Sequence, residues 1–276
     1  MDIIITLLIT IIGAILSAIF MPVWYKVHKT KNIECELVAS TKSKILDDVI
    51  EFYLEKIHYS ERVSPSFIKF FLDSEKHNIT TIKNLEIACN KSLAPKHILL
   101  ASKFEGNIIG IIKIIYLCDI NSFFIAYYAA KPNKNCSSSA ILNSILDFLI
   151  EKIELVDNIY YEICENEEDK RESEAKSRLF KHYAESRNFS VNCIIKNYLQ
   201  PEISAFDEGF LEPVPAKLYS LSRHTYIQNI NSTKNALQSI FKGVYADSFY
   251  HVNNEHYEQF CEYLDMIQSD ILESKL

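Results

Sequence analysis

Glycine is scarce in this sequence: only five of the 276 residues are glycine, at positions 13, 106, 110, 209 and 243. Neither G-x-G-x-x-G nor G-x-x-x-x-G-K-[ST] can be built from these positions. The two glycine-rich loops that commonly hold nucleotide phosphates are therefore excluded. The motifs H-E-x-x-H and G-x-S-x-G are also absent, so neither a zinc-protease helix nor an α/β-hydrolase nucleophile is predicted.

Paired cysteine spacing is missing too. The chain has seven cysteines, an odd number, and no C-x-x-C pair. This pattern argues against a disulfide framework or a zinc ribbon and predicts unpaired thiols in a reducing compartment. The eight histidines are scattered, and His251 and His256 are five residues apart rather than four, so no metal is predicted. A net charge of −7 argues against nucleic acid as a partner.

A long apolar run is present at the N-terminus, where no charged residue occurs between Ile3 and Tyr25. A helix needs about 20 mostly apolar residues to span a membrane. A cleaved signal peptide is the alternative, but there is no basic segment before the run and no A-x-A site after it. A buried core helix is disfavoured because the apolar residues occur all round the helix. We expect residues 1–25 to be a retained transmembrane anchor.

Lysines follow this run closely, at Lys26, Lys29 and Lys31, whereas Asp2 precedes it. By the positive-inside rule, the N-terminus lies outside and the rest of the chain lies in the cytoplasm. Residues 26–32 are then a basic juxtamembrane linker. The predicted location is the cell membrane, crossed once.

Apolar periodicity divides the rest of the chain into strands and helices. Continuous or alternating apolar runs predict strands, and apolar residues at the 3.6-residue period predict helices. The first predicted helix is capped by Thr41 or Ser43. The second begins at Ser64 and Pro65. A loop with Pro213, Val214 and Pro215 separates the last two strands. Residues 78–90 give no clear pattern. The predicted strands are 33–39, the hairpin 97–117, 123–130, 158–164, 190–199 and 216–222; the predicted helices are 46–57, 65–72, 140–153, 177–187 and two within 232–276.

One loop is suited to holding an anion. Ala130, Lys131 and Pro132 end a strand, and residues 135–140 (NCSSSA) then open a helix. Free backbone N–H groups and the helix dipole make a helix N-terminus an anion site. The alternative is that Ser137 or Ser138 merely caps the helix.

The order of elements from Ile33 to Arg223 resembles the GNAT superfamily of N-acetyltransferases. In that family a strand ending in a small residue and a proline precedes a loop [Q/R]-x-x-G-x-[G/A], which binds the pyrophosphate of acetyl-CoA. Ala140 matches its last position, whereas Asn135 and Ser138 stand where Gln or Arg and Gly are usual. The resemblance implies an α/β (α+β) fold with a GNAT-like mixed central sheet. It also implies acetyl-CoA as the co-substrate and an amine acceptor whose identity the sequence does not give.

The resemblance also assigns roles to residues. A backbone N–H near Ala129 is implied to support the developing oxyanion, and the strand end lines the pantetheine arm. The implied cofactor-binding residues are Tyr128, Ala129, Ala130, Asn135, Cys136, Ser137, Ser138, Ser139, Ala140 and, after the next strand, Asn166.

Two residues are candidates for catalysis. Tyr183 lies in a helix that resembles the family pattern A-x-x-[LF]-Y-x-x-x-G-F, where the tyrosine often protonates the departing thiolate. Two positions differ from the pattern: Asn188 replaces the glycine, and Tyr183 is one residue farther from Phe189 than the pattern requires. Its apolar helical stripe is equally compatible with core packing. Glu162, in a strand, is the candidate relay for the proton of the amine. Cys136 is either an acyl-accepting thiol or a neutral loop residue.

The sequence therefore predicts an acyltransferase domain over residues 33–223 and a helical extension over residues 224–276. The two amphipathic helices of this extension pack on the domain, on a protein partner or on a second copy of the chain. The function predicted is transfer of an acetyl or other acyl group from acyl-CoA to an amine by a membrane-anchored enzyme. The alternative is a catalytically degenerate, membrane-tethered binding module with the same fold.

Overall fold

The structure, a computed structural model, describes residues 33–57, 63–79, 81, 94–152, 156–165, 170–201, 212–223, 230–252 and 254–274. The predicted anchor (1–25), the linker (26–32) and Asn166 lie outside the described residues. Within these ranges, no helix has the length and apolarity needed to cross a bilayer.

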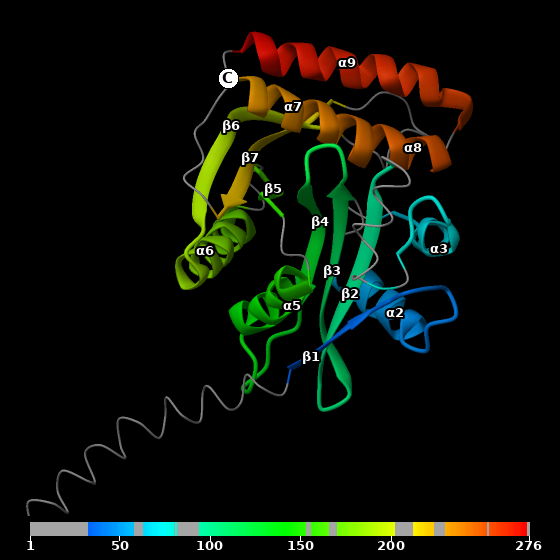
Figure 1. Cartoon of the computed structure of the whole chain (residues 1–276), viewed down its shortest axis with the longest axis vertical. Helices are drawn as coiled ribbons and strands as arrows, with labels where there is room; N and C mark the ends of the chain where they lie inside the picture. The colour runs from blue at the N-terminus through cyan, green and yellow to red at the C-terminus, as the bar shows by residue number, and fades with distance from the viewer. Residues whose placement is uncertain are drawn as a thin grey trace, which may run out of the picture.

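A seven-stranded mixed sheet forms the centre of the molecule (Figure 1). Its spatial order is β1-β2-β3-β4-β5-β7-β6, and β4 and β5 pair in parallel whereas every other neighbouring pair is antiparallel. The predicted strands are confirmed with small shifts in their ends. They are β1 (Ile33–Leu37), β2 (Lys96–Phe104), β3 (Asn107–Leu117), β4 (Ser122–Ala130), β5 (Asn158–Cys164), β6 (Ser190–Gln200) and β7 (Val214–Ser222).

Helices cover both faces of this sheet. On one face lie α5 (Ser138–Lys152) and α6 (Lys170–Arg187). On the other face lie α2 (Leu46–Lys56) and α3 (Pro65–Asp73), beside a C-terminal group of helices. This group consists of α7 (Ile230–Ile240), the π-helix η3 (Phe241–Ala246), α8 (Asp247–Val252), the 3-10 turn η4 (Asn254–His256) and α9 (Tyr257–Glu273).

The helix starts test two capping predictions. The Ser64 side chain accepts a hydrogen bond from the Phe67 N–H at 3.3 Å and proline follows it, so the predicted start of α3 is confirmed. The predicted cap of α2 is wrong, because α2 begins after Ile45 without a side-chain cap. Thr41 instead donates to Asp73 at 2.6 Å, which ties the start of this segment to the end of α3.

Two glycines are needed where they stand. Gly106, in the turn between β2 and β3, has a φ of 79°, a conformation that side chains with a Cβ rarely adopt. Gly110, on β3, lies against α5: a Cβ added there would be 2.3 Å from Cγ2 of Ile141. The missing side chain at Gly110 therefore lets the start of α5 lie directly on the sheet, beside the end of β4.

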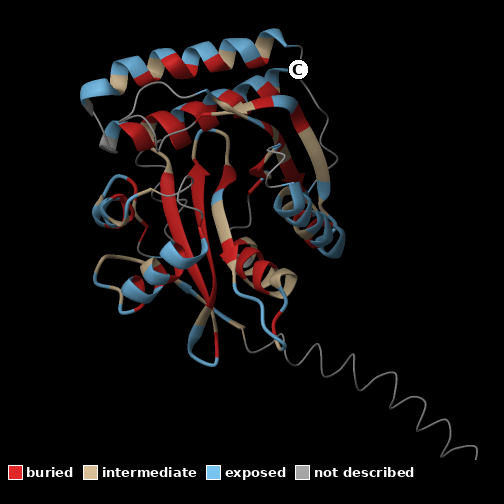
Figure 2. Cartoon of the chain, turned by 180° about the vertical axis from the view of Figure 1, so that it is seen from behind, coloured by how far each residue is buried: buried red, intermediate tan, exposed pale blue. Residues whose placement is uncertain are grey.

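The C-terminal helices belong to the same packed body as the sheet. Figure 2 shows their buried sides turned toward the strands and their exposed sides turned outward. One apolar cluster joins Tyr160 and Leu218 of the strands to Leu237, Phe249 and Phe260 of these helices. Burying apolar surface of this kind is the main source of folding stability. Of the options that the sequence left open, the structure shows packing on the domain itself.

Two details of the sequence prediction are wrong. Val214 and Pro215 are part of β7, where Pro215 pairs with Leu199, rather than part of the preceding loop. Cys118 is disulfide-bonded, so the prediction of unpaired thiols fails at this residue. The thiols that lie outside any disulfide are those of Cys35, Cys136, Cys164, Cys193 and Cys261.

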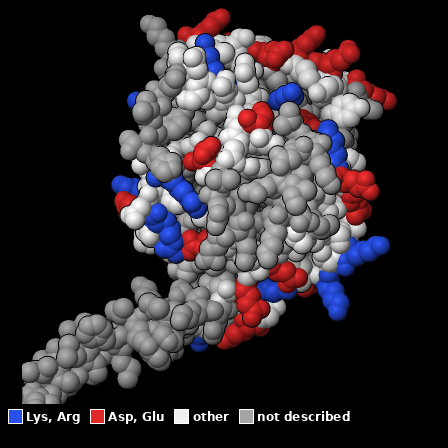
Figure 3. All heavy atoms as spheres, in the orientation of Figure 1, with Lys and Arg blue, Asp and Glu red and all other residues white. Residues whose placement is uncertain are grey.

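Negative charge gathers on the outer side of α9 (Figure 3). This helix carries five acidic residues and no lysine or arginine. Such a surface repels the phosphate backbones of nucleic acids. The acidic residues are Glu258, Glu262, Asp265, Asp270 and Glu273, all exposed.

A buried lysine lies on β3, on the face covered by α3. The Lys113 side chain is 7% exposed, and its Nζ lies 5.3 Å and 5.1 Å from the ring centres of Phe67 and Phe71. Burial lowers its pKa to about 8. Keeping Lys113 charged in the folded protein therefore lowers the free energy of unfolding.

We expect Lys113→Met to raise the free energy of unfolding at pH 7 by about 2 kcal/mol, because the burial of a charge is removed. In the wild type, the unfolded chain binds the extra proton between pH 8 and the ordinary lysine pKa of 10.5. Stability should therefore rise with pH across that range, and this rise should vanish in the variant. Urea unfolding at pH 7 and pH 9.5 measures both effects. A variant less stable than the wild type would mean that the two rings outweigh the burial cost.

Candidate active site

The parallel strands β4 and β5 separate part of the way along their length. They pair from Ser122 with Asn158 to Ile125 with Tyr161, and no strand pairing connects them further on in the described residues. The separation coincides with a bulge in β4: Tyr127 pairs with Lys113 and Ile125 with Ile114, so Ala126 is the extra residue. Bulges bend a strand and are frequent beside active sites. The two strands therefore form a fork that begins at Ile125 and Tyr161.

One arm of the fork is the end of β4. Tyr128, Ala129 and Ala130 pair with β3 on one side, so the edge that faces β5 has no strand partner. Ala129 is buried, whereas Tyr128 and Ala130 are half-buried. The Tyr128 hydroxyl donates to the Ser138 carbonyl at 2.8 Å, which fastens the start of α5 to this arm. The predicted backbone donor near Ala129 remains a prediction.

The loop after β4 uses several of its own N–H groups. The Asn133 side chain accepts from the N–H groups of Asn135 at 2.8 Å and Cys136 at 2.9 Å. The Ser137 hydroxyl accepts from the Ala140 N–H at 3.2 Å, so Ser137 is the cap of α5. The helix itself begins at Ser138.

These bonds reduce the number of N–H groups that are left for the predicted anion site. First-turn N–H groups have no acceptor within their own helix, so the predicted anion site now rests on the N–H groups of Ser138 and Ser139. Asn135, Cys136 and Ala140 contribute to the shape of the loop through the bonds just given, and the Cys136 side chain is 1% exposed within the core. The cap and the anion site are thus compatible, since they use different N–H groups of one helix end.

The other arm of the fork begins with Glu162, the first residue of β5 beyond the pairing with β4. Its carboxylate is 7% exposed and accepts the Tyr245 hydroxyl at 2.8 Å at each oxygen. Burial raises the pKa of Glu162 to about 7, and the hydroxyls of Tyr198 and Tyr245 oppose this rise. A carboxylate with a pKa near neutrality is suited to accept a proton at physiological pH.

Tyr183 lies on the opposite face of the sheet from Glu162. Its side chain is fully buried between α6 and α5, and its hydroxyl is 3.4 Å from Oδ1 of Asp147. The same oxygen of Asp147 also accepts a hydrogen bond from Nε of Arg187 at 2.8 Å. Burial, with the negative charge of Asp147, raises the pKa of Tyr183 above its ordinary value. The structure therefore keeps this hydroxyl protonated, and its catalytic role remains a prediction.

Sequence reasoning missed three residues that shape this site. Asn133 organises the loop, Tyr245 donates a hydrogen bond to Glu162, and the hydroxyl of Tyr198 lies beside the same carboxylate. Tyr245 comes from the π-helix η3, more than eighty positions along the chain from Glu162. In the sequence it is one member of an apolar helical stripe, so nothing local marks it as a partner of a carboxylate.

Solved structures similar to this chain include acetyltransferases. A diaminobutyrate acetyltransferase from Paenibacillus lautus, solved with its substrate and coenzyme A, is 15% identical, with 70% of this chain and 98% of that chain covered and a TM-score of 0.43. A spermidine N-acetyltransferase from Vibrio cholerae is 13% identical, with coverage of 71% and 97% and a TM-score of 0.40. An N-acetyltransferase from Staphylococcus aureus is 9% identical, with coverage of 69% and 97% and a TM-score of 0.41.

No protein-family model and no curated protein sequence matches the chain. At these identities and TM-scores, the solved structures do not carry an argument about function.

Proposed function

We propose that this chain is an N-acetyltransferase that moves the acetyl group of acetyl-CoA to an amine. The observation that carries the proposal is the fork between the parallel strands β4 and β5, next to the N-terminus of α5. A thioester arm can lie along an unpaired strand edge, and a helix N-terminus can hold the phosphates of the same molecule. The order of elements, which resembles the GNAT superfamily, supports the same function.

In this proposal the cofactor is held by main-chain groups. The N–H groups of Ser138 and Ser139 face the pyrophosphate, and the hydroxyls of Ser137 and Ser139, 3.0 Å from each other, add donors beside it. Tyr128 keeps the helix end next to β4, so that the pantetheine arm follows Tyr128, Ala129 and Ala130. The backbone N–H near Ala129 supports the oxyanion of the thioester carbonyl.

The amine enters on the side of Glu162. Its nitrogen must lose a proton to attack the carbonyl carbon; Glu162 accepts this proton, directly or through water. The new C–N bond forms, the C–S bond breaks, and the sulfur takes a proton, for which Tyr183 remains the predicted donor. The acceptor is an amine of undetermined identity.

We also retain membrane attachment as part of the proposal. The support is the uncharged run from Ile3 to Tyr25 and the three lysines after it, which place the catalytic domain on the cytoplasmic side.

A second candidate function is a membrane-tethered binding module that has lost catalysis. Two observations favour it: Asn133 and Ser137 already occupy three N–H groups of the loop, and Tyr245 covers the carboxylate of Glu162. In that case acetyl-CoA binds without turnover, or does not bind at all.

Calorimetric titration of acetyl-CoA into the purified chain tests the proposal. We expect a micromolar Kd, on the order of −8 kcal/mol, and at least about 100-fold weaker binding by Ser138→Glu, whose carboxylate repels the phosphates. Ser269→Glu adds the same charge on the exposed side of α9 and should bind as the wild type does. If the wild type gives no binding, the acetyltransferase proposal is wrong.

A further inference from the structure

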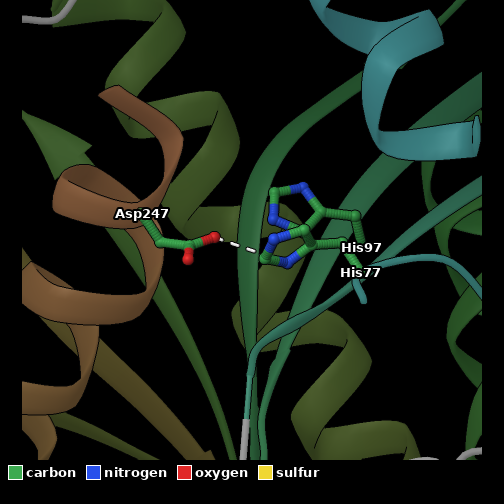
Figure 4. A group of neighbouring side chains, drawn as sticks. All are labelled: His77, His97 and Asp247. Atoms are coloured by element: carbon green, nitrogen blue, oxygen red, sulfur yellow. Dashed lines mark ion pairs between the residues drawn. The ribbon is translucent and has the colours of Figure 1, made fainter. Parts of the chain in front are cut away.

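Three potential metal ligands from distant parts of the chain meet where the sheet joins the C-terminal helices. His77 lies in the turn after α3, His97 lies on β2, and Asp247 is the first residue of α8. One ligand atom of each lies within 4.8 Å of those of the other two. Figure 4 shows the two imidazole rings beside each other and the carboxylate of Asp247 pointing at them from the opposite side.

The spacing of these atoms fits a small tetrahedral ion. Metal–nitrogen and metal–oxygen bonds of about 2.0–2.1 Å place neighbouring ligand atoms about 3.3 Å apart. Nδ1 of His77 and Oδ2 of Asp247 are 3.4 Å apart, so one edge of the tetrahedron is already present. A His97 nitrogen at the full 4.8 Å from both other atoms would complete the triangle after moving inward by about 1.7 Å.

The two imidazole rings are held in place by their surroundings. Nδ1 of His77 is 3.1 Å from the Pro95 carbonyl and donates to it, because a carbonyl can only accept. The ring of His97 stacks on Phe71, with ring centres 3.6 Å apart and planes 6° apart. The backbone N–H of His97 donates to the backbone carbonyl of His77 at 2.9 Å, which links the two segments directly. An ion that binds at Nδ1 replaces the proton there, which leaves to solvent, and the ion takes the place of the hydrogen bond to the Pro95 carbonyl.

The carboxylate has an outer partner and an open side. The other oxygen of Asp247, Oδ1, lies 3.4 Å from Nζ of Lys76, which orients the carboxylate as outer partners of metal ligands commonly do. Asp247 also lines a cavity of about 330 Å³, together with Lys76, Ser239 and Lys242. His77 is fully buried, and the side chain of Asp247 is 16% exposed. The cavity therefore gives an ion a route in and gives a water molecule a place beside it.

An ordinary ion pair between Asp247 and His77 would account for one contact of this cluster. It does not account for a second buried imidazole, that of His97, with a ring nitrogen within 4.8 Å of the same two atoms. Two imidazoles and one carboxylate are the donor set of zinc and related transition metals, whereas magnesium and calcium prefer oxygen ligands throughout.

We propose that His77, His97 and Asp247 bind a divalent transition-metal ion of the zinc type, with its fourth position open to the cavity. The ion bridges β2 and the turn after α3 to the start of α8. It therefore fastens the C-terminal helices to the sheet, in addition to the apolar packing between them.

Cobalt is a suitable first probe, because tetrahedral Co²⁺ absorbs strongly in visible light. Titration of Co²⁺ into the purified full-length chain should give this absorption at one equivalent, and one equivalent of Zn²⁺ should abolish it. The variant Asp247→Asn keeps the shape of the side chain and removes the charge, and we expect its Zn²⁺ Kd to rise at least about 10-fold. The variant His97→Gln should show no tetrahedral absorption.

His182→Gln is the matched control, because His182 is exposed on α6, away from this cluster. It should bind as the wild type does. Far-ultraviolet circular dichroism establishes that each variant is folded, and Zn²⁺ should raise the midpoint of thermal unfolding of the wild type but not of Asp247→Asn. If the wild type takes up no Co²⁺ or Zn²⁺, or if a folded Asp247→Asn binds Zn²⁺ equally well, the proposal is wrong.

Discussion

Glu162→Gln is expected to transfer acetyl groups about 100- to 1,000-fold more slowly than the wild-type chain, because the group that takes the proton of the amine is lost. Glutamine has the size of glutamate and can still pair with the Tyr245 hydroxyl, so the fork should keep its shape. The Kd of acetyl-CoA should be unchanged, since Glu162 lies on the other arm of the fork from the α5 N-terminus. Steady-state rates with a panel of primary amines, beside calorimetric titration, separate the two effects.

The pH dependence gives a second readout for Glu162. With a pKa of about 7, its carboxylate is mostly protonated at pH 6, so the rate should rise with pH and level off above neutrality. Tyr245→Phe removes a hydrogen bond that favours the charged form. The rising part of its profile should therefore lie at higher pH, with activity recovered at the alkaline end. In Glu162→Gln this part of the profile should be absent.

Stability should change with pH in the opposite direction. Because the folded pKa of Glu162 is raised from 4.5 to about 7, the folded state binds more protons between these values. The free energy of unfolding should therefore fall as the pH rises from 4.5 to about 7, and Glu162→Gln should flatten this fall.

Glu165→Gln is the control for both measurements. Glu165 is an exposed glutamate just after β5, and its side chain pairs at the surface with Lys217. We expect it to keep wild-type rates and wild-type pH dependence. Full activity of Glu162→Gln would assign Glu162 a structural role and remove it from the proposed mechanism.

Phe260→Ala should lower the free energy of unfolding by about 3–5 kcal/mol, the usual cost of removing a large buried ring. Phe260 on α9 is fully buried and stacks on Phe249 of α8, with ring centres 4.0 Å apart. Both rings belong to the cluster that includes Tyr160 and Leu218 of the sheet. Urea unfolding, followed by circular dichroism and by tyrosine fluorescence, should therefore give one transition at a lower urea concentration.

Met266→Ala is the comparison on the same helix, because the Met266 side chain is 53% exposed. Its effect should stay within about 0.5 kcal/mol, as is usual for surface positions. Two separate transitions in the wild type would contradict the single packed body, since the C-terminal helices would then unfold independently of the sheet.

The strands were predictable from the sequence because each carries its own local signal. The Gly106 turn, with β-branched residues on both sides, placed the β2–β3 hairpin, and the uncharged run of residues 123–130 placed β4. The start of α3 was equally local, since Ser64 and Pro65 are adjacent. The start of α2 was predicted wrongly: Thr41 and Ser43 are good caps, but their hydroxyl groups are used elsewhere.

The chemistry of the site was only partly predictable. Residues 135–140 were recognisable as a helix start, yet the sequence could not say that the Asn133 side chain takes up two of their N–H groups. Burial raises the pKa of Glu162, and this rise is limited by the hydroxyl of Tyr245, which comes from another element. The cluster of His77, His97 and Asp247 has no spacing that a motif could capture, because its members come from three separate segments.

The π-helix η3 determines how two side chains are rotated about the helix axis: that of Tyr245, which contacts Glu162, and that of Asp247, which contacts His77. A π-turn holds an additional residue compared with an α-turn, and it often marks a functional position. Successive residues of an α-helix are rotated by about 100°. If Phe241–Ala246 became α-helical with the same number of residues, the additional residue would rotate everything after it by about that angle. Tyr245 would then turn away from Glu162 and Asp247 away from His77, so the length of this one turn sets both contacts at once.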